Sequence, residues 1–322
     1  MARPELSIVI PTCNRPDLLV ACLRSVCRYA PAGTEILVVD DGSEGAGVIA
    51  IARAFGVRAL RLPRRKGFCA AANAGISAAR GSVIELLNDD TEVTQDWAGH
   101  ALALFADSSV GAVAPLALMA SSHAPETRID SAGDRYFLGG VAGKRCHGEP
   151  LRPAHIKSCR VFGASASCAF YRRDALEAVG CFPEEFGAYF EDVDLAFRLN
   201  RAGFLVIFEP ASRVYHCRSA SYGTPNRRLL ERHSFNEERV FWRNLPGPVL
   251  RRAIPLHLAV LAAKMWRRWR EGNLIPFVVG RLRVLSEVPE ILQYRRRLQK
   301  RYPALDVIGW QLENRYWGGH NA

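Results

Sequence analysis

Apolar strands and helical segments alternate through the first hundred residues, and this order constrains the fold more than any other feature. Leu6–Pro11, Glu35–Asp40 and Val83–Leu87 are short and almost continuously apolar. Apolar residues at helical spacing follow the first strand, and an alanine-rich helical segment over 67–80 precedes the third. Strands of this kind are typical of parallel sheets that helices cover on both faces. The sequence therefore predicts an α/β fold with a mostly parallel sheet flanked by helices.

The rest of the chain consists of a less regular middle and a helical end. Residues 110–160 scatter Gly, Ser, Pro and His among apolar runs, so we expect strands and long loops there. Helical spacing returns at Arg172–Val179 and Glu191–Ala202, and a short apolar strand follows at Leu205–Phe208. From about Pro225 onward the pattern is helical and rich in arginine.

The net charge of +11 is concentrated in one C-terminal segment. Residues 239–301 contain 15 Lys and Arg against three acidic residues, so the remaining chain is close to neutral. Trp242, Trp266 and Trp269 lie among these arginines, and the apolar stretch Leu258–Met265 leads into one cluster. Basic amphipathic helices with tryptophan are typical of segments that bind anionic bilayer surfaces. The alternative is a solvated basic bundle packed on the rest of the protein.

Cysteine usage and hydropathy favour a cytoplasmic protein. The nine cysteines form no CxxC motif, so we expect free thiols in a reducing compartment. A zinc site of Cys146, His147 and Cys159 is an alternative, although its spacing matches no standard pattern. We find no run of about 18 apolar residues and no apolar signal-peptide core. We therefore expect a cytoplasmic protein, with peripheral attachment to the inner face of the cell membrane through the basic segment.

Acidic pairs follow two of the predicted strands. Asp89 and Asp90 come after Val83–Leu87, and Asp41 follows the strand that ends at Asp40. Open α/β sheets bind ligands at the carboxyl ends of their strands. The adjacent carboxylates of Asp89 and Asp90 suit Mg²⁺ or Mn²⁺ carrying a diphosphate. An acid at Asp41 can instead accept a hydrogen bond from a base N–H or a ribose hydroxyl. A solvated turn is the alternative for each pair.

A third acidic pair, Glu191 and Asp192, lies at the start of a predicted helix, directly after two aromatic residues. Helix capping is the plain interpretation of acids at this position. A partly buried carboxylate would instead have a raised pKa and could act as a general base. Asp194 and Arg198, four residues apart, are expected to pair on the helix surface.

Basic groups and one histidine could also contact a diphosphate. Arg65 and Lys66 precede a helix N-terminus, where side chains and backbone N–H groups together favour anions. A solvated basic turn is the alternative. His216 lies beyond the Leu205–Phe208 strand and the turn expected at Pro210. It is either a structural histidine or a further ligand of a metal held elsewhere.

Together these motifs resemble glycosyltransferase family 2, the inverting enzymes with the GT-A fold. The resemblance covers about residues 6–222 and rests on LSIVIPTCNRPDLL, EILVVDDGS, KGFCAAANAGISAARGSVIELLNDDTEV and the region from GASASCAFYRR to VYHCRSAS. It implies a Rossmann-like nucleotide-sugar-binding half at 1–105 and an acceptor and catalytic-base half at 106–225. A basic, mainly helical extension would occupy 226–322. The motif sequences are most like those of bacterial rhamnosyltransferase-type members, although Pro183 occupies a position where these usually have an acid.

The resemblance also implies roles for individual residues. Asp192 would be the general base, with Glu191 beside it. Asp90 would hold Mn²⁺ or Mg²⁺, and His216 would be a further ligand. The residues implied in nucleotide binding are Pro11, Thr12, Asn14, Asp41, Arg65, Lys66 and Asp89.

The implied function is a metal-dependent inverting glycosyltransferase. It would move a sugar from a UDP-, dTDP- or GDP-linked donor to a hydroxyl of a saccharide or lipid-linked acceptor, in bacterial cell-surface polysaccharide synthesis. Residues from about 240 to 301 would bind an anionic membrane surface. A sugar nucleotidyltransferase is an alternative, although Pro11–Arg15 lacks the expected glycines. Because the N-terminal two thirds of the chain carry almost no net charge, a nucleic-acid-binding protein is disfavoured. A non-catalytic sugar-binding relative is disfavoured because all the acids expected from the resemblance are present.

Overall fold

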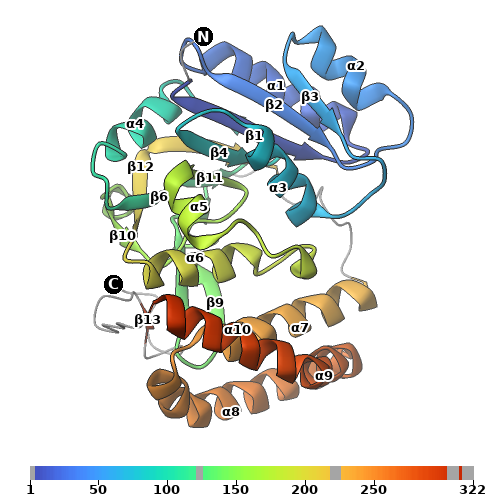
Figure 1. Cartoon of the computed structure of the whole chain (residues 1–322), viewed down its shortest axis with the longest axis vertical. Coiled ribbons are helices and arrows are strands. Elements are labelled where there is room, and N and C mark those ends of the chain that lie inside the picture. The colour runs from blue at the N-terminus through green and yellow to red at the C-terminus, as the bar shows by residue number, and fades with distance from the viewer. Residues whose placement is uncertain (1–3, 121–125, 218–225, 303–311, 314–322) are drawn as a thin grey trace.

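The computed structural model describes residues 4–120, 126–217, 226–302 and 312–313 of the 322. Figure 1 shows a twisted central sheet with helices on both sides, and a layer of C-terminal helices beneath it in that view. The main sheet has the strand order β10-β12-β6-β11-β4-β1-β2-β3, with β5 paired to β12 and β7 to β6. The predicted α/β fold with a mostly parallel central sheet and a helical C-terminal part is confirmed.

The N-terminal half of the sheet is entirely parallel. Its strands are β1 (Leu6–Thr12), β2 (Glu35–Asp40), β3 (Arg58–Arg61) and β4 (Val83–Leu87). Its connecting helices are α1 (Pro16–Tyr29), α2 (Gly47–Ala54) and α3 (Phe68–Ala78). Every residue of β1 and β4 is buried, as continuous apolar strands require. Functional side chains that follow these strands therefore gather at one edge of the sheet.

The second half of the sheet mixes strand directions. Its strands are β5 (Thr91–Val93), β6 (Val110–Met119), β7 (Ile129–Ser131), β10 (Cys159–Val161), β11 (Cys168–Arg172) and β12 (Leu205–His216). β11 lies antiparallel between β4 and β6, whereas β12 runs parallel to β6. Its helices are α4 (Trp97–Leu104), α5 (Arg173–Val179) and α6 (Glu191–Arg201), with short 3₁₀ turns at Pro153–His155 and Glu184–Phe186.

The strand that contains His216 is longer than expected. The sequence predicts that it ends at Phe208, but β12 continues to His216, with a register irregularity between Glu209 and Arg213. Proline lacks the N–H that a ladder needs, and Pro210 lies inside this irregularity, where a bulge tolerates it. Beyond the irregularity β12 pairs with β5, which sets His216 opposite Thr91 and next to Asp90.

A small second sheet and the C-terminal helices complete the described chain. The sheet contains β8 (Asp134–Phe137), β9 (Val141–Lys144) and β13 (Leu312–Glu313). The helices are α7 (Arg227–Asn244), α8 (Gly247–Arg270), α9 (Leu274–Arg283) and α10 (Val288–Arg301), with a 3₁₀ turn, η3, at Val284–Glu287. Among the described helices, none is both long and apolar enough to span a bilayer.

The C-terminal helices share the main hydrophobic core. Val240 and Phe241 of α7, together with Ala253 of α8, belong to the same buried cluster as the sheet residues Val9 and Leu86. Several basic residues of this layer pair with buried acids of α7: Glu237 with Lys264 and Arg281, and Glu238 with His257 and Arg281. Part of the basic character seen in the sequence is therefore neutralised inside the protein.

Candidate active site

One cavity of about 800 Å³ lies at the carboxyl ends of β1, β2 and β4, next to the start of α6. Its lining includes these predicted site residues: Pro11, Thr12, Asp41, Arg65, Asp90, Glu191, Asp192 and His216. Asn14, Lys66 and Asp89 are not part of the lining. The structure thus brings most of the predicted residues together, from segments that lie far apart in the sequence.

Asp89 is a fully buried acid held by two side chains from the β1–α1 junction. It accepts a hydrogen bond of 2.6 Å from the Thr12 hydroxyl and forms an ion pair with Arg15. Burial raises the pKa of Asp89 to about 6, against the opposing effect of Arg15. Arg15 also lies 3.4 Å from Asp90. Sequence reasoning assigned no role to Arg15, because nothing in the sequence indicates that its side chain reaches acids that follow β4.

His216 bridges two carboxylates. Its Nε2 lies 3.2 Å from Asp90 Oδ1, and its Nδ1 lies 3.0 Å from Asp130 Oδ2. Burial alone would lower the pKa of His216, but the hydrogen bonds to Asp130 and Asp90 outweigh burial and raise it to about 9. Asp130 also accepts a hydrogen bond of 2.8 Å from Lys144. Asp130 and Lys144 line the cavity too, and sequence reasoning missed both, since they lie in the irregular middle of the chain outside any motif.

Asp41 holds the loop that precedes α3. Its two carboxylate oxygens accept hydrogen bonds from the backbone N–H groups of Lys66, at 2.7 Å, and Gly67, at 2.9 Å. Gly42 has a φ of +65°, and a Cβ there would lie 2.5 Å from the backbone of Arg64, so only glycine fits. Lys66 therefore contributes its backbone, while the neighbouring Arg65 lines the cavity.

Asn14 connects two loops instead of facing the cavity. Its side-chain oxygen accepts a hydrogen bond of 2.7 Å from the N–H of Glu44, and its own N–H donates to the Ser43 hydroxyl at 2.8 Å. Asn14 has a φ of 55°, a conformation that asparagine tolerates better than most residues. These bonds fix the loop after β1 to the loop after β2.

Glu191 and Asp192 begin α6, but neither acts as its N-cap. The N-cap is Phe190, which has no side-chain capping bond. Asp192 accepts hydrogen bonds from the N–H groups of Ala166, at 3.3 Å, and Val193, at 2.8 Å. Burial is the main cause that raises the pKa of both acids, and for Glu191 the neighbouring charge of Asp192 adds to it. A buried carboxylate with a raised pKa has the properties of a general base.

The alternative zinc set is not assembled. His147 directs Nδ1 to the carbonyl oxygen of Asp130 at 2.6 Å, and Cys159 accepts a hydrogen bond from Arg145. Cys146 instead lies with Glu149 and His155, whose ligand atoms are within 4.8 Å of one another. Burial raises the pKa of the Cys146 thiol, which disfavours the thiolate that zinc binds. We therefore assign no metal to this group.

Comparison with known proteins identifies the family. The model described as "Glycosyl transferase family 2" matches residues 7–180, more than half of the chain. The chain therefore belongs to glycosyl transferase family 2.

Several curated proteins are similar to this chain in sequence. The uncharacterised protein y4gI of Sinorhizobium fredii is 33% identical over 262 residues, which are 74% of this chain and 28% of y4gI. The O-antigen biosynthesis protein RfbC of Myxococcus xanthus is 29% identical, with 68% of this chain and 18% of RfbC covered. An N-acetylglucosaminyl-diphospho-decaprenol L-rhamnosyltransferase of Mycobacterium tuberculosis is 34% identical, with 34% of this chain and 38% of the relative covered. The chain thus spans well under half the length of each of these relatives.

Solved structures support the GT-A fold. The mannosyltransferase PcManGT of Pyrobaculum calidifontis, in complex with GDP-Man and Mn²⁺, gives a TM-score of 0.55 at 19% identity, with 96% of this chain and 88% of that chain covered. GalNAc-T7 with UDP, GalNAc and Mn²⁺ gives 0.60 at 20% identity, with 75% and 48% covered. At these identities the likeness shows the fold alone.

Proposed function

We propose that this chain is an inverting, divalent-metal-dependent glycosyltransferase that uses a nucleotide diphosphate sugar. The observation that carries this proposal is the placement of Asp90 and His216 in the same cavity as Asp192. Asp90 and His216 are suited to bind a metal ion at the diphosphate end of a donor. Asp192 is suited to accept the proton of an acceptor hydroxyl. The solved neighbours that hold Mn²⁺ with GDP-Man, or with UDP and GalNAc, support the choice of ligand class.

The donor set at the metal position fits Mn²⁺ or Mg²⁺. Asp90 offers a carboxylate, and His216 offers an imidazole nitrogen once metal binding displaces its proton; the two lie 3.2 Å apart. Carboxylate oxygen with imidazole nitrogen suits Mn²⁺, while Mg²⁺ prefers oxygen donors and retained waters. Asp90 and His216 would hold the ion, which supplies positive charge that stabilises the leaving diphosphate. Arg65 lines the same cavity and is proposed to bind the diphosphate oxygens directly.

Asp192 is the proposed general base. Its carboxylate takes the proton of the acceptor hydroxyl while that oxygen attacks the anomeric carbon. The new glycosidic bond forms on the face opposite the breaking bond to the diphosphate, so one displacement inverts the configuration. No covalent glycosyl-enzyme intermediate is needed, unlike in a retaining two-carboxylate hydrolase. The raised pKa of Asp192, caused mainly by burial, makes its carboxylate a stronger proton acceptor than an exposed aspartate.

The other predicted site residues are proposed to act on the nucleotide through the shape of the site. Pro11, Thr12 and Asp41 line the cavity beside Arg65. Asn14 and Asp89 act behind this surface, and Lys66 contributes a backbone N–H to Asp41. We propose that the nucleotide lies against the loops after β1 and β2, which these contacts hold in place.

A thermal-shift panel tests donor binding directly. UDP-, dTDP- and GDP-linked sugars are each added at about 1 mM, the upper end of common KM values, with and without Mn²⁺ or Mg²⁺. Ligands that bind only the folded state raise the melting temperature. We expect one nucleotide class to do so in a metal-dependent way. If no donor stabilises the protein with either metal, the proposed donor site is wrong.

The acceptor is proposed to be a saccharide or a lipid-linked saccharide in bacterial cell-surface polysaccharide synthesis, and the protein is proposed to act at the inner face of the membrane. The relative RfbC is an O-antigen biosynthesis protein, which supports this pathway class. In the C-terminal layer, Trp266 and Trp269 of α8 are 61% and 59% exposed. Ile275 and Leu282 of α9 are also exposed, seven residues apart and so on one helix face. Exposed basic residues lie before, between and after these apolar side chains in the sequence: Arg267, Arg270, Arg283, Arg296, Arg297 and Lys300.

Vesicle co-sedimentation tests the membrane proposal. We expect the full chain to bind vesicles that contain anionic phosphatidylglycerol, and to bind neutral phosphatidylcholine vesicles much more weakly. The double substitution Trp266→Ala/Trp269→Ala should reduce binding to anionic vesicles. Binding that is equal for the two vesicle types, or unchanged by the double substitution, would contradict a basic aromatic contact surface.

A further inference from the structure

The loop directly before Glu191 and Asp192 has an unfavourable backbone conformation. Tyr189 and Phe190 have φ values of 70° and 68°, in the left-handed region that residues other than glycine rarely adopt. Two such residues in succession persist only when their surroundings hold them. The conformation sets the direction in which α6 begins, and so the position of the two acids at its start.

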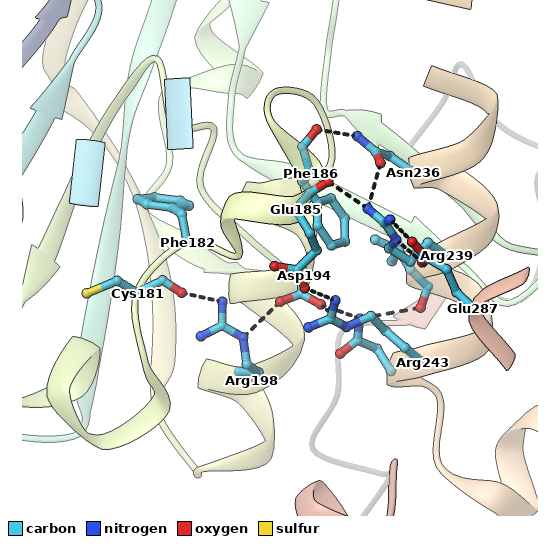
Figure 2. A network of polar contacts seen from close by, with 12 residues as sticks. Cys181, Phe182, Glu185, Phe186, Asp194, Arg198, Asn236, Arg239, Arg243 and Glu287 are labelled. Atoms are coloured by element: carbon cyan, nitrogen blue, oxygen red, sulfur yellow. Dashed lines mark hydrogen bonds and ion pairs between the residues drawn. The ribbon is translucent and has the colours of Figure 1, made fainter. Parts of the chain in front are cut away.

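Asn236 of α7 holds this loop through three carbonyl groups. Its side-chain amide nitrogen lies 3.0 Å from Phe186 O, 3.1 Å from Ala188 O and 3.0 Å from Tyr189 O. The side chain is almost fully buried, at 1% exposure. Figure 2 shows Asn236 directed from α7 toward the turn that contains Phe186. An amide has two N–H groups, so the three carbonyls share them, and their polarity is satisfied away from water.

Arg239, one turn further along α7, fixes the orientation of Asn236. Its Nη1 donates to Asn236 Oδ1 and to the carbonyl of Glu185, both at 3.1 Å. Arginine can only donate, so the Asn236 oxygen must face Arg239 and the nitrogen must face the loop. Glu287 of η3 pairs with the same guanidinium, with Nε to Oε2 at 2.6 Å (Figure 2).

α7 also binds α6 itself, two residues after Asp192. Asp194 is fully buried and contacts Arg198 at 2.9 Å, Arg243 at 3.1 Å and Asn244 at 2.8 Å. The predicted Asp194–Arg198 pair therefore exists, but it is buried against α7 and does not lie on a helix surface. The prediction was wrong on this point because the sequence does not show that α7 covers this face of α6.

We propose that Asn236 is a positioning residue for the catalytic base, and that α7 is an integral part of the active centre. Asn236, oriented by Arg239, keeps residues 186–190 in the one conformation that places Asp192 in the cavity. The identity of Asp192 as the base rests on the proposed function, whereas the bracing of the loop does not. α7 therefore serves the active centre, in addition to the membrane contact proposed for the C-terminal helices.

The test compares Asn236→Ala with Val284→Ala in the full chain. Val284 is buried with Phe235 and Ile291 in the same C-terminal layer and belongs to a cluster separate from the loop, so it serves as a control for lost packing. Amide hydrogen exchange over residues 186–193 is measured by mass spectrometry, together with donor affinity and kcat. For Asn236→Ala we expect faster exchange in this segment, a kcat lower by about 10- to 100-fold and an unchanged donor Kd, because small misplacement of a reacting group is costly.

The control should lower the melting temperature without these local effects. If Asn236→Ala and Val284→Ala change loop exchange and kcat alike, Asn236 has only a structural role and the proposal is wrong. Arg239→Lys provides a second variant, since lysine keeps the charge beside Glu287 but not the planar fork that donates to Asn236 and Glu185 together. We expect a smaller rise in loop exchange from it, and an unchanged exchange rate would contradict the orienting role.

Failure of the proposed function gives a different result. If Asp192→Asn keeps full turnover, Asp192 is not the base, while the exchange data still report whether Asn236 braces the loop. If Asp192→Asn abolishes turnover but Asn236→Ala changes neither exchange nor kcat, the base assignment stands and the positioning proposal is wrong.

Discussion

Two pairs of adjacent acids lie at the cavity or directly behind its lining, and their surroundings differ. Asp89 and Asp90, after β4, lie beside the cationic side chain of Arg15 and the imidazole of His216. At the start of α6, Glu191 is buried and Asp192 is partly buried, and Asp192 accepts hydrogen bonds from backbone N–H groups. Burial raises the pKa of Asp89 as well, but there the charge of Arg15 opposes it. For Glu191 no positive charge opposes burial, and for Asp192 the main opposing contacts are backbone N–H groups.

This difference separates two kinds of chemistry within one site. Carboxylates that already have positive neighbours are suited to remain ionised and to share their charge with a metal ion. Carboxylates in a desolvated place with few positive neighbours are suited to accept a proton. The environment, more than the residue type, thus assigns the roles proposed for Asp90 and Asp192.

The largest effect is expected from Asp192→Asn, which removes the proposed base and keeps its shape. Loss of a general base costs about 10²- to 10⁴-fold in rate. We expect kcat to fall by this amount while the donor Kd, measured by calorimetry, stays unchanged. Asp174→Asn, an exposed aspartate on α5, is the matched control and should behave like the wild type. Turnover near the wild-type rate in Asp192→Asn would remove the distinction between the two pairs.

Asp90→Ala should act on donor binding instead. Removing the proposed metal ligand is expected to weaken metal-dependent donor binding by at least about 10-fold, since ligand-shell changes have effects of this order. Binding measured without a divalent ion should change little. Calorimetric titrations with and without Mn²⁺ check both statements. An unchanged response to Mn²⁺ would mean that the ion, if used, is held elsewhere.

The pH dependence of kcat sharpens the comparison further. Because burial raises the pKa of Asp192, its proton-accepting form is lost as the pH falls through that raised value. The acid limb of the kcat profile should therefore lie above the ordinary aspartate pKa of about 3.9. Asp192→Glu, if active, should shift this limb. A limb at or below the ordinary value would indicate that Asp192 does not carry the rate-limiting proton transfer.

The sequence predicts the parallel N-terminal half of the sheet better than the rest of the molecule. β2 and β4 have the predicted bounds, and β1 extends one residue further, to Thr12. β1 and β4 are buried along their whole length and β2 at every residue but Ile36, so their apolar runs carry a strong local signal. Asp90 and Asp192 could be predicted as site residues because each lies in a local motif, and the structure adds that both line one cavity.

The contacts that the sequence could not predict are long-range ones. Arg15 and Asp90 are 75 residues apart in the chain, His216 and Asp130 are 86 apart, and Asn236 and Tyr189 are 47 apart. None of these contacts has a spacing that could be recognised in one sequence. Basic residues near the C-terminus suggested a surface function, but Arg239 and Arg243 are buried. Arg239 forms an ion pair with Glu287 of η3, and Arg243 forms ion pairs with Glu185 and with Asp194 of α6.

The smallest effect is expected from removing the charge of Arg15, the cation beside Asp89 and Asp90. Arg15→Gln removes the charge that lies between Asp89 and Asp90 and leaves Asp89, which is fully buried, without its ion-pair partner. We expect the free energy of unfolding to fall by about 1–3 kcal/mol, the usual penalty when a buried polar group loses its partner. Arg24→Gln, an exposed position on the same helix, is the control for a lost surface charge and should change stability by less than about 0.5 kcal/mol.

A double-mutant cycle with Asp89→Asn isolates this interaction. If Arg15 stabilises the ionised acid, Arg15→Gln should cost less in the Asp89→Asn background than in the wild type, with a coupling energy of about 0.5–3 kcal/mol. Denaturant unfolding of the four proteins at neutral pH measures it. A coupling energy near zero would mean that Asp89 does not depend on Arg15 for its charge. The two acid pairs would then differ in their contacts but not in their electrostatics, and the division of roles between them would rest on Asp192 alone.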